Sequence, residues 1–159
     1  MAQMTGGQAL AASLLAQDVA VIFGLPGVQL DWAFDALYAV QDRIRVIHTR
    51  HEQATSYMAD GYARTTGRPG VCLVVPGPGL LNAASGLATA YACSSPVLCL
   101  AGQIATDFID RGRGVLHEVP RQLELAGSFT KWAARALAPG EVPGLVAEAF
   151  AQMASGRPR

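Results

Sequence analysis

This sequence of 159 residues lacks net charge. Lys plus Arg and Asp plus Glu both number 12, and no basic run stands out. Proteins that bind nucleic acids or anionic membranes usually carry a basic patch, so the charge supports neither partner. Charge is also missing locally, because no charged residue occurs between Gly70 and Thr106.

This uncharged stretch does not predict a membrane span. A spanning helix needs about 20 unbroken apolar residues, whereas Pro76, Pro78 and Pro96 interrupt the stretch. The N-terminus shows no basic region followed by an apolar block, so no signal peptide is expected. We therefore expect a cytoplasmic protein that does not bind a membrane.

Cysteine is scarce as well. Cys72, Cys93 and Cys99 are odd in number, lie in apolar surroundings and form no Cys-x-x-Cys pair. This pattern argues against a disulfide framework and against a zinc site, and it fits a reducing compartment. No metal ligands are predicted in this chain.

What the sequence does contain is typical of one folded domain: 51% of its residues are hydrophobic and 15% are charged. Apolar runs predict strands at 19–23, 44–47, 71–75 and 97–101, with a further strand within 129–138. Helical periodicity predicts helices at 5–16, 30–40, 80–93 and 142–153, and another that follows residue 50. Alternating strands and helices favour an α/β fold, a three-layer sandwich with a mainly parallel sheet and helices on both faces.

The segment 50–64 begins where the second predicted strand ends. We expect one helix face to hold its small and apolar side chains (Ala54, Tyr57, Met58, Gly61 and Tyr62), with Asp60 and Arg64 on the other side. Glu52 then lies at the carboxyl end of a strand, where open α/β sheets collect their ligands.

The predicted helix 80–93 has no charged outer face. A helix on the surface of a monomer normally shows one. We therefore expect another subunit or domain to cover this helix.

Four features follow predicted strands: Gly24–Gly27, His51–Glu52, Gly77–Gly79 with Asn82, and His117–Glu118. In a parallel sheet such loops meet at one edge and can converge on one ligand. The glycines do not spell Gly-x-Gly-x-x-Gly and no Walker motif occurs, so dinucleotide binding has little support.

The motifs identify a family. Gly-Leu-Pro-Gly, Arg-His-Glu-Gln-Ala…Met-Ala-Asp-Gly-Tyr-Ala-Arg and Gly-Pro-Gly-Leu-Leu-Asn-Ala…Gly-Leu-Ala-Thr-Ala-Tyr occur in this order. Together they resemble the N-terminal pyrimidine-binding domain of thiamine-diphosphate enzymes of the acetolactate synthase, pyruvate oxidase and benzoylformate decarboxylase group. The resemblance covers essentially the whole chain.

The resemblance implies a role for Glu52. It matches the glutamate that hydrogen-bonds a ring nitrogen of the cofactor aminopyrimidine. That bond favours the imino tautomer, which removes the proton from thiazolium C2 and so creates the nucleophile. A desolvated carboxyl suits this proton sharing. Outside the motif, Glu52 would be read as an ordinary acid at a helix N-terminus.

Further cofactor contacts are implied for Pro26 and Gly27, in the turn over the pyrimidine, and for Val75, Pro78 and Asn82, which line the cleft. Asn82 has an alternative role, which is to satisfy backbone groups at the start of its helix.

His117 departs from the family pattern. Acetolactate synthases and pyruvate oxidases usually carry Phe-Gln before the glutamate, whereas this chain has Leu116-His117-Glu118, closer to the Leu-His-His of simple 2-oxo acid decarboxylases. His117 is therefore a candidate catalytic proton donor or acceptor, the alternative being a loop histidine bonded to its neighbours. We expect His48 to be structural and His51 to position the Glu52 turn.

The family anchors the diphosphate through Mg²⁺ in a separate domain with a Gly-Asp-Gly motif, which does not occur here. The expectation is one domain over residues 1–159 that holds half of a thiamine-diphosphate site and is inactive alone. Its partner would be a diphosphate-binding domain of another or the same chain, in a dimer or tetramer that acts on a 2-oxo acid. FAD stays open, because the central domain that would bind it is absent. The alternatives are a stand-alone small subunit of a two-chain decarboxylase and a non-catalytic assembly domain.

Overall fold

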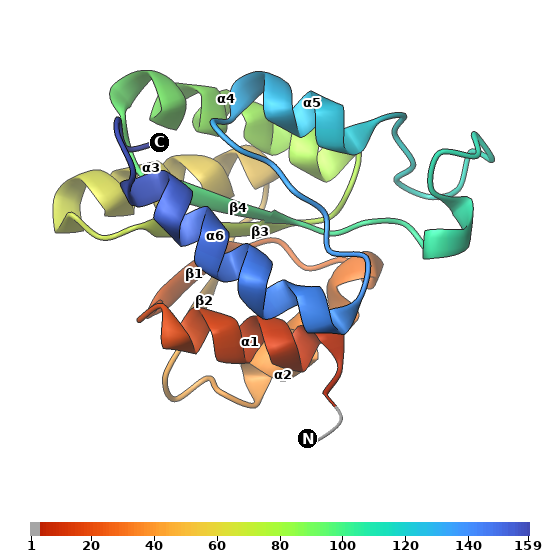
Figure 1. Cartoon of the computed structure of the whole chain (residues 1–159), viewed down its shortest axis with the longest axis horizontal. Helices are drawn as coiled ribbons and strands as arrows, with labels where there is room; N and C mark the ends of the chain where they lie inside the picture. Colours follow the sequence, from red (N-terminus) through yellow and green to blue (C-terminus); the bar gives the residue numbers. More distant parts are fainter. Residues whose placement is uncertain (1–3) are drawn as a thin grey trace.

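A sheet of four parallel strands lies at the centre of the computed structural model, which describes residues 4–159 (Figure 1). Their order across the sheet is β2-β1-β3-β4. The strands are β1 (Val21–Gly24), β2 (Arg45–His48), β3 (Gly70–Val74) and β4 (Val97–Ala101). The α-helices are α1 (Gly6–Ala16), α2 (Asp31–Tyr38), α3 (Glu52–Thr66), α4 (Pro78–Cys93), α5 (Gln122–Phe129) and α6 (Val142–Ala154), and 3-10 helices occupy Val28–Leu30 (η1), Thr106–Phe108 (η2) and Pro139–Glu141 (η3).

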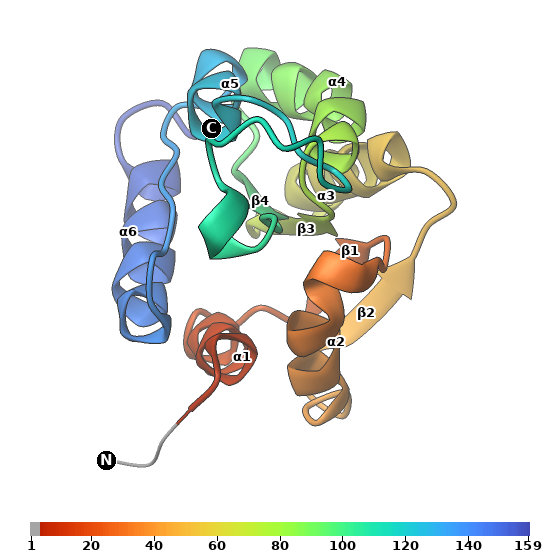
Figure 2. The same ribbon diagram turned by 90° about the vertical axis from the view of Figure 1, so that its right-hand side faces the viewer.

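Helices cover both faces of the sheet. α1, α2 and α6 lie on one face, and α3, α4 and α5 lie on the other (Figures 1 and 2). A hydrophobic core lies on each face of the sheet, and strand β3 contributes to both. Val71 and Leu73 pack on the side of α1, α2 and α6, whereas Cys72 and Val74 pack on the side of α3, α4 and α5. Successive side chains of a strand point to opposite faces, so a sheet with two apolar faces needs two helical layers. The α/β fold of three layers is confirmed.

The helix ends follow their local sequence signals. Thr5 and Gln8 form a reciprocal capping box at the start of α1. Gly67 ends α3 with a φ of +70°, a left-handed conformation that glycine adopts without strain. Pro78 is the first residue of α4, where its missing N–H costs nothing.

The buried face of α3 differs from the prediction. Tyr57 and Met58 are 42% and 39% exposed, and the buried residues are Thr55, Ser56, Ala59, Asp60 and Ala63. The reason is close packing against α4, since a Cβ at Gly86 would come within 2.2 Å of Ser56 Oγ. Small side chains therefore face inward, and the Thr55 and Ser56 hydroxyls donate to carbonyls of their own helix.

Asp60 is buried as well, although we expected it on the outer side of α3. Its carboxylate is bound by Arg64, with Oδ1 2.9 Å from Nε and Oδ2 2.7 Å from the second terminal nitrogen. This contact raises the pKa of the Arg64 guanidinium. Because Arg64 lies one turn after Asp60, it neutralises the carboxylate that α3 buries. Arg64 also contacts Ser95, just before β4.

The strand predicted within 129–138 is wrong. Residues 122–129 form helix α5, and no strand occurs from 130 to 138, within the described part of the chain. β4 is an edge strand, but within the described residues the apolar segment around Trp132 lines the cavity beside β4 and does not pair with its free edge or with any other partner strand. A strand needs such a partner, whatever its sequence pattern.

Candidate functional site

The candidate site lies at the carboxyl ends of the strands. The loop after β4 extends from this edge, to the right in Figure 1 and toward the viewer in Figure 2. The turn after β1 is tied to β3, because Leu25 N–H donates to Leu73 O, and the turn after β2 is tied to β1 through Thr49 N–H and Gly24 O. The parallel topology thus brings the motif loops to one edge, as predicted.

Glu52 is the first residue of α3 and is half-buried. The preceding residue, His51, caps the helix: its Nδ1 accepts from the Gln53 backbone N–H at 3.2 Å. His51 therefore has the positioning role that we expected for it. The helix N-terminus favours a negative charge at Glu52, because the first backbone N–H groups point toward it.

Asn82 lies in the second turn of α4 and reaches Glu52. Its Nδ2 donates to Glu52 Oε2 at 3.0 Å. In residues 4–159 this is the only hydrogen bond of the Glu52 carboxylate, so Oε1 has no protein donor there. Asn82 thus orients the acid, and its side chain makes no hydrogen bond to the start of its own helix within the described residues.

Val75 joins the two glycine turns. A Cβ at Gly27 would lie 2.4 Å from Val75 Cγ1, and a Cβ at Gly79 would lie 2.5 Å from Val75 Cγ2. The same Cβ at Gly79 would lie 3.5 Å from Glu52 Oε1. Only glycine lets these backbones approach so closely, and Gly79 keeps space beside the carboxylate. Pro26 and Pro78 flank this contact and are exposed.

Gly77 ties the β3 turn to the loop after β4. Its φ is +57°, and a Cβ there would lie 2.2 Å from His117 O. Its N–H donates to Gln122 Oε1 at 2.8 Å, and Gln122 Nε2 donates to Gly102 O at 2.9 Å. Sequence reasoning missed Gln122, since one glutamine in the first turn of a helix gives no signal of a contact 45 residues away.

His117 is half-buried beside this turn. Its Nδ1 lies 2.9 Å from Gln29 Oε1, and Gln29 Nε2 donates to Leu116 O at 3.2 Å. No hydrogen bond joins His117 to Glu52 among the described residues. Gln29 was also missed. His48 packs edge-to-face on Phe34, with ring centroids 5.9 Å apart, as a structural residue does.

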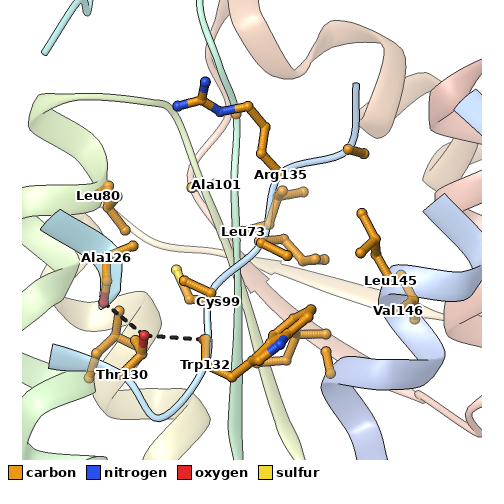
Figure 3. A pocket seen from close by; sticks show the side chains of 18 of the residues that line it. Leu73, Leu80, Cys99, Ala101, Ala126, Thr130, Trp132, Arg135, Leu145 and Val146 are labelled. Carbon is orange, nitrogen blue, oxygen red and sulfur yellow. Dashed lines mark hydrogen bonds between the residues drawn. The ribbon is translucent and has the colours of Figure 1, made fainter. Parts of the chain in front are cut away.

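A cavity of about 460 Å³ borders β4, α5 and α6, and its labelled lining side chains are mostly apolar (Figure 3). Cys99 and Ala101 line it from β4, Leu145 and Val146 from α6, and Trp132 from the segment that follows α5. Glu52 and Asn82 do not line it.

No cluster of three or more His, Cys, Asp or Glu side chains suited to a metal ion occurs in residues 4–159. No helix in the same residues is long and apolar enough to cross a membrane.

Residues 4–125 match the family model of the N-terminal, cofactor-binding domain of thiamine pyrophosphate enzymes. The chain belongs to this family. It is therefore a pyrimidine-binding domain of a thiamine-diphosphate enzyme, as its motifs indicate.

Relatives of this thiamine-diphosphate domain include decarboxylases and synthases. It is 41% identical to a probable 2-ketoarginine decarboxylase of Pseudomonas aeruginosa, an alignment that covers 98% of this chain and 28% of that protein. It is 41% identical to a probable acetolactate synthase large subunit of Methanocaldococcus jannaschii, over 98% and 25%. It is 39% identical to acetolactate synthase isozyme 3 large subunit of Escherichia coli, over 99% and 27%. The chain thus spans about a quarter of the length of these relatives.

The arrangement of this thiamine-diphosphate domain suits the pyrimidine of the cofactor. A carboxylate with one oxygen held by Asn82 and the other without a protein donor in the described residues can bind a ring nitrogen. The glycines on either side of Val75 let its side chain pack against both turns, next to the carboxylate.

Proposed function

We propose that this domain supplies the pyrimidine half of a thiamine-diphosphate site in an enzyme that decarboxylates or ligates 2-oxo acids, a lyase or transferase. The observation that carries the proposal is the Glu52–Asn82 pair at the carboxyl edge of the sheet. The printed names of the relatives, a 2-ketoarginine decarboxylase and acetolactate synthases, support this reaction class.

When bound, thiamine diphosphate supplies the carbanion chemistry that the reaction needs. The protein groups prepare it. Glu52 holds a proton at the pyrimidine ring nitrogen, and Asn82 fixes the carboxylate oxygen that does not take part. Pro26, Gly27, Val75 and Pro78 form the surface against which the ring is placed. His117 gives or takes a proton near the reacting atoms.

The site is completed by a diphosphate-binding domain that holds Mg²⁺, in an oligomer. The exposed face of α3 and α4 supports such a partner. It carries Tyr57 and Met58 from α3 and Leu81 from α4, and Leu81 is 45% exposed. Neighbouring α4 residues on this face, Ser85 and Ala88, are exposed and uncharged. Contact with a second domain would bury this apolar surface, which stabilises association by roughly 25 cal/mol per Å².

The test is reconstitution. The chain is mixed with a diphosphate-binding domain of the family, Mg²⁺, thiamine diphosphate and a panel of 2-oxo acids that includes pyruvate and 2-ketoarginine. We expect CO₂ release that requires both domains and the cofactor, with no turnover by this chain alone.

Two other outcomes would contradict parts of the proposal. Turnover by this chain without a second domain would disprove the proposal that the domain holds only half of the cofactor site. Tight association with a diphosphate-binding domain but no cofactor binding and no turnover would instead identify a non-catalytic assembly domain.

A further inference from the structure

Gln29 joins two segments that are far apart in the sequence but in contact in the fold. It lies in η1, the 3-10 turn after Pro26 and Gly27, and it is half-buried. Its side chain binds Leu116 and His117, 87 and 88 residues further along the chain. Both polar atoms of the amide are used in these contacts, so Gln29 is held at two points.

The two contacts fix which way the amide points. Leu116 O can only accept, so the Gln29 atom that faces it is the NH₂ group, at 3.2 Å. The carbonyl oxygen Oε1 then faces His117 Nδ1 at 2.9 Å. Because this oxygen can only accept, Nδ1 must carry the hydrogen. Neutral His117 therefore has its hydrogen on Nδ1 and a lone pair on Nε2.

The backbone of His117 is held as well. Its φ is +67°, and its carbonyl oxygen occupies the space that a side chain at Gly77 would fill. The His117 backbone thus lies against the turn that leads into α4, the helix that carries Asn82. Gln29 binds the ring, and the absence of a side chain at Gly77 lets the main chain approach.

We infer that Gln29 is a positioning residue, which holds His117 in the Nδ1–H tautomer and leaves Nε2 as the nitrogen that exchanges protons. The Nδ1–H···Oε1 bond is the same in neutral and in protonated His117. A proton can therefore arrive at or leave Nε2 without any rearrangement of the Gln29 contact, which is the kind of preorganisation that lowers reorganisation cost. The catalytic consequence rests on the proposed function, whereas the tautomer does not.

The tautomer can be measured on this chain alone. With ¹⁵N-labelled histidine at alkaline pH, where the ring is neutral, two-dimensional ¹H–¹⁵N spectra distinguish the two ring nitrogens. A His117→Gln variant assigns the signals. We expect a pyrrole-type nitrogen at Nδ1 and a pyridine-type nitrogen at Nε2.

Three variants test whether Gln29 determines the His117 tautomer. Gln29→Leu removes the acceptor and should convert His117 to a mixture that contains the Nε2–H tautomer. Gln29→Glu keeps an acceptor oxygen at the same reach and should retain Nδ1–H. Gln103→Leu is the matched control, since Gln103 bonds only the neighbouring Ile104 N–H in the described residues and should change nothing.

An Nε2–H tautomer in the unsubstituted chain, or a Gln29→Leu spectrum that keeps the original tautomer, would overturn the inference. Far-UV circular dichroism checks that each variant is folded. In the reconstituted enzyme, Gln29→Leu should lower kcat about tenfold or more with little change in KM, and Gln29→Glu should retain more activity. Absence of turnover in the unsubstituted assembly would count against the proposed function and leave the tautomer result standing.

Discussion

Two regions of this domain differ in how much space and how much chemistry they contain. Beside β4 there is a cavity of about 460 Å³ with mostly apolar walls (Figure 3). At the carboxyl ends of β1 to β3 the chain is crowded instead, and glycines bring Val75 into contact with two turns. There the polar side chains occur in pairs, Glu52 with Asn82 and His117 with Gln29.

The comparison teaches that the cavity is the poorer candidate for catalysis. A catalytic site needs polar groups whose positions are fixed before substrate arrives. Each of the two pairs at the sheet edge joins side chains from segments far apart in the sequence, so the fold itself sets their geometry. The cavity is lined mainly by apolar side chains, and Gln29 and Gln122 border it from the side of the sheet edge.

The largest expected effect is the loss of the Glu52 carboxylate. Glu52→Gln keeps the shape but removes the group that shares a proton with the cofactor, so turnover of the reconstituted enzyme should fall by about 10²- to 10⁴-fold. Glu148→Gln is the control, because Glu148 lies on α6 and contacts only Gln152 within the described residues. Equal turnover by Glu52→Gln and the unsubstituted chain would show that the Glu52 carboxylate takes no part in the reaction.

The Asn82 contact should matter less than the acid itself. Asn82→Ala leaves Glu52 without its orienting donor, and a hydrogen bond to a charged group contributes about 1.5–3 kcal/mol. We expect cofactor affinity to fall by about tenfold or more, as measured by calorimetric titration of the assembly. Ser85→Ala, about one turn further along the exposed side of α4, should leave the affinity unchanged.

Crowding at the sheet edge predicts a stability effect. In Gly79→Ala the new Cβ would lie 2.5 Å from Val75 Cγ2, so the free energy of unfolding should fall by about 1–3 kcal/mol. Val75→Ala in the same chain removes that methyl group and should restore part of the loss.

The matched control for this crowding is Gly144→Ala in α6. Nothing lies within 4 Å of a Cβ at this position, so stability should rise by about 0.5–1 kcal/mol. Denaturant titrations measure both effects. If the losses in free energy of unfolding caused by Gly79→Ala and by Val75→Ala simply add in the double variant, the two residues do not crowd each other.

The smallest effect concerns the strands between the two regions. Cys72 on β3 is paired in register with Cys99 on β4, which also lines the cavity. The hydrogen bond with Cys99 and burial raise the pKa of the Cys72 thiol well above its ordinary value of 9.0.

Because the folded pKa is the higher one, the stabilisation is fully present below pH 9.0 and is lost as the pH rises above that value. The loss is at most about 1.4 kcal/mol per pH unit. Cys72→Ala should flatten this alkaline decline in denaturant titrations, whereas replacement of the exposed Cys93 by Ala should not. An unchanged slope in Cys72→Ala would show that the Cys72 thiol loses its proton equally in the folded and unfolded states, against a raised pKa.

Most of the fold could be predicted from sequence because its signals are local. Capping at Thr5, the left-handed Gly67 and the apolar strands all depend on neighbours within a few residues. The failures depend on distant partners. The prediction of the buried face of α3 was wrong because close contact with Gly86 selects small side chains. The strand predicted near Trp132 was wrong because its residues line the cavity beside β4 and do not pair with the free edge of that strand.

The same distinction holds for the site. Glu52 and Asn82 follow recognisable motifs, so they could be chosen as candidates before the geometry was known. Gln29 and Gln122 carry no such signal, since a glutamine has a role only when a distant loop meets it. The catalytic roles of Glu52 and His117 stay predictions until they are tested in an assembled enzyme.

The measurement that tests the central claim most directly is a double-mutant cycle between Glu52 and the cofactor. Turnover of the reconstituted enzyme is compared for Glu52 and Glu52→Gln, each with thiamine diphosphate and with an analogue in which the pyrimidine nitrogen is replaced by C–H. If Glu52 acts through that nitrogen, either change alone causes nearly the full loss and the second adds little. Losses that multiply independently would contradict the account.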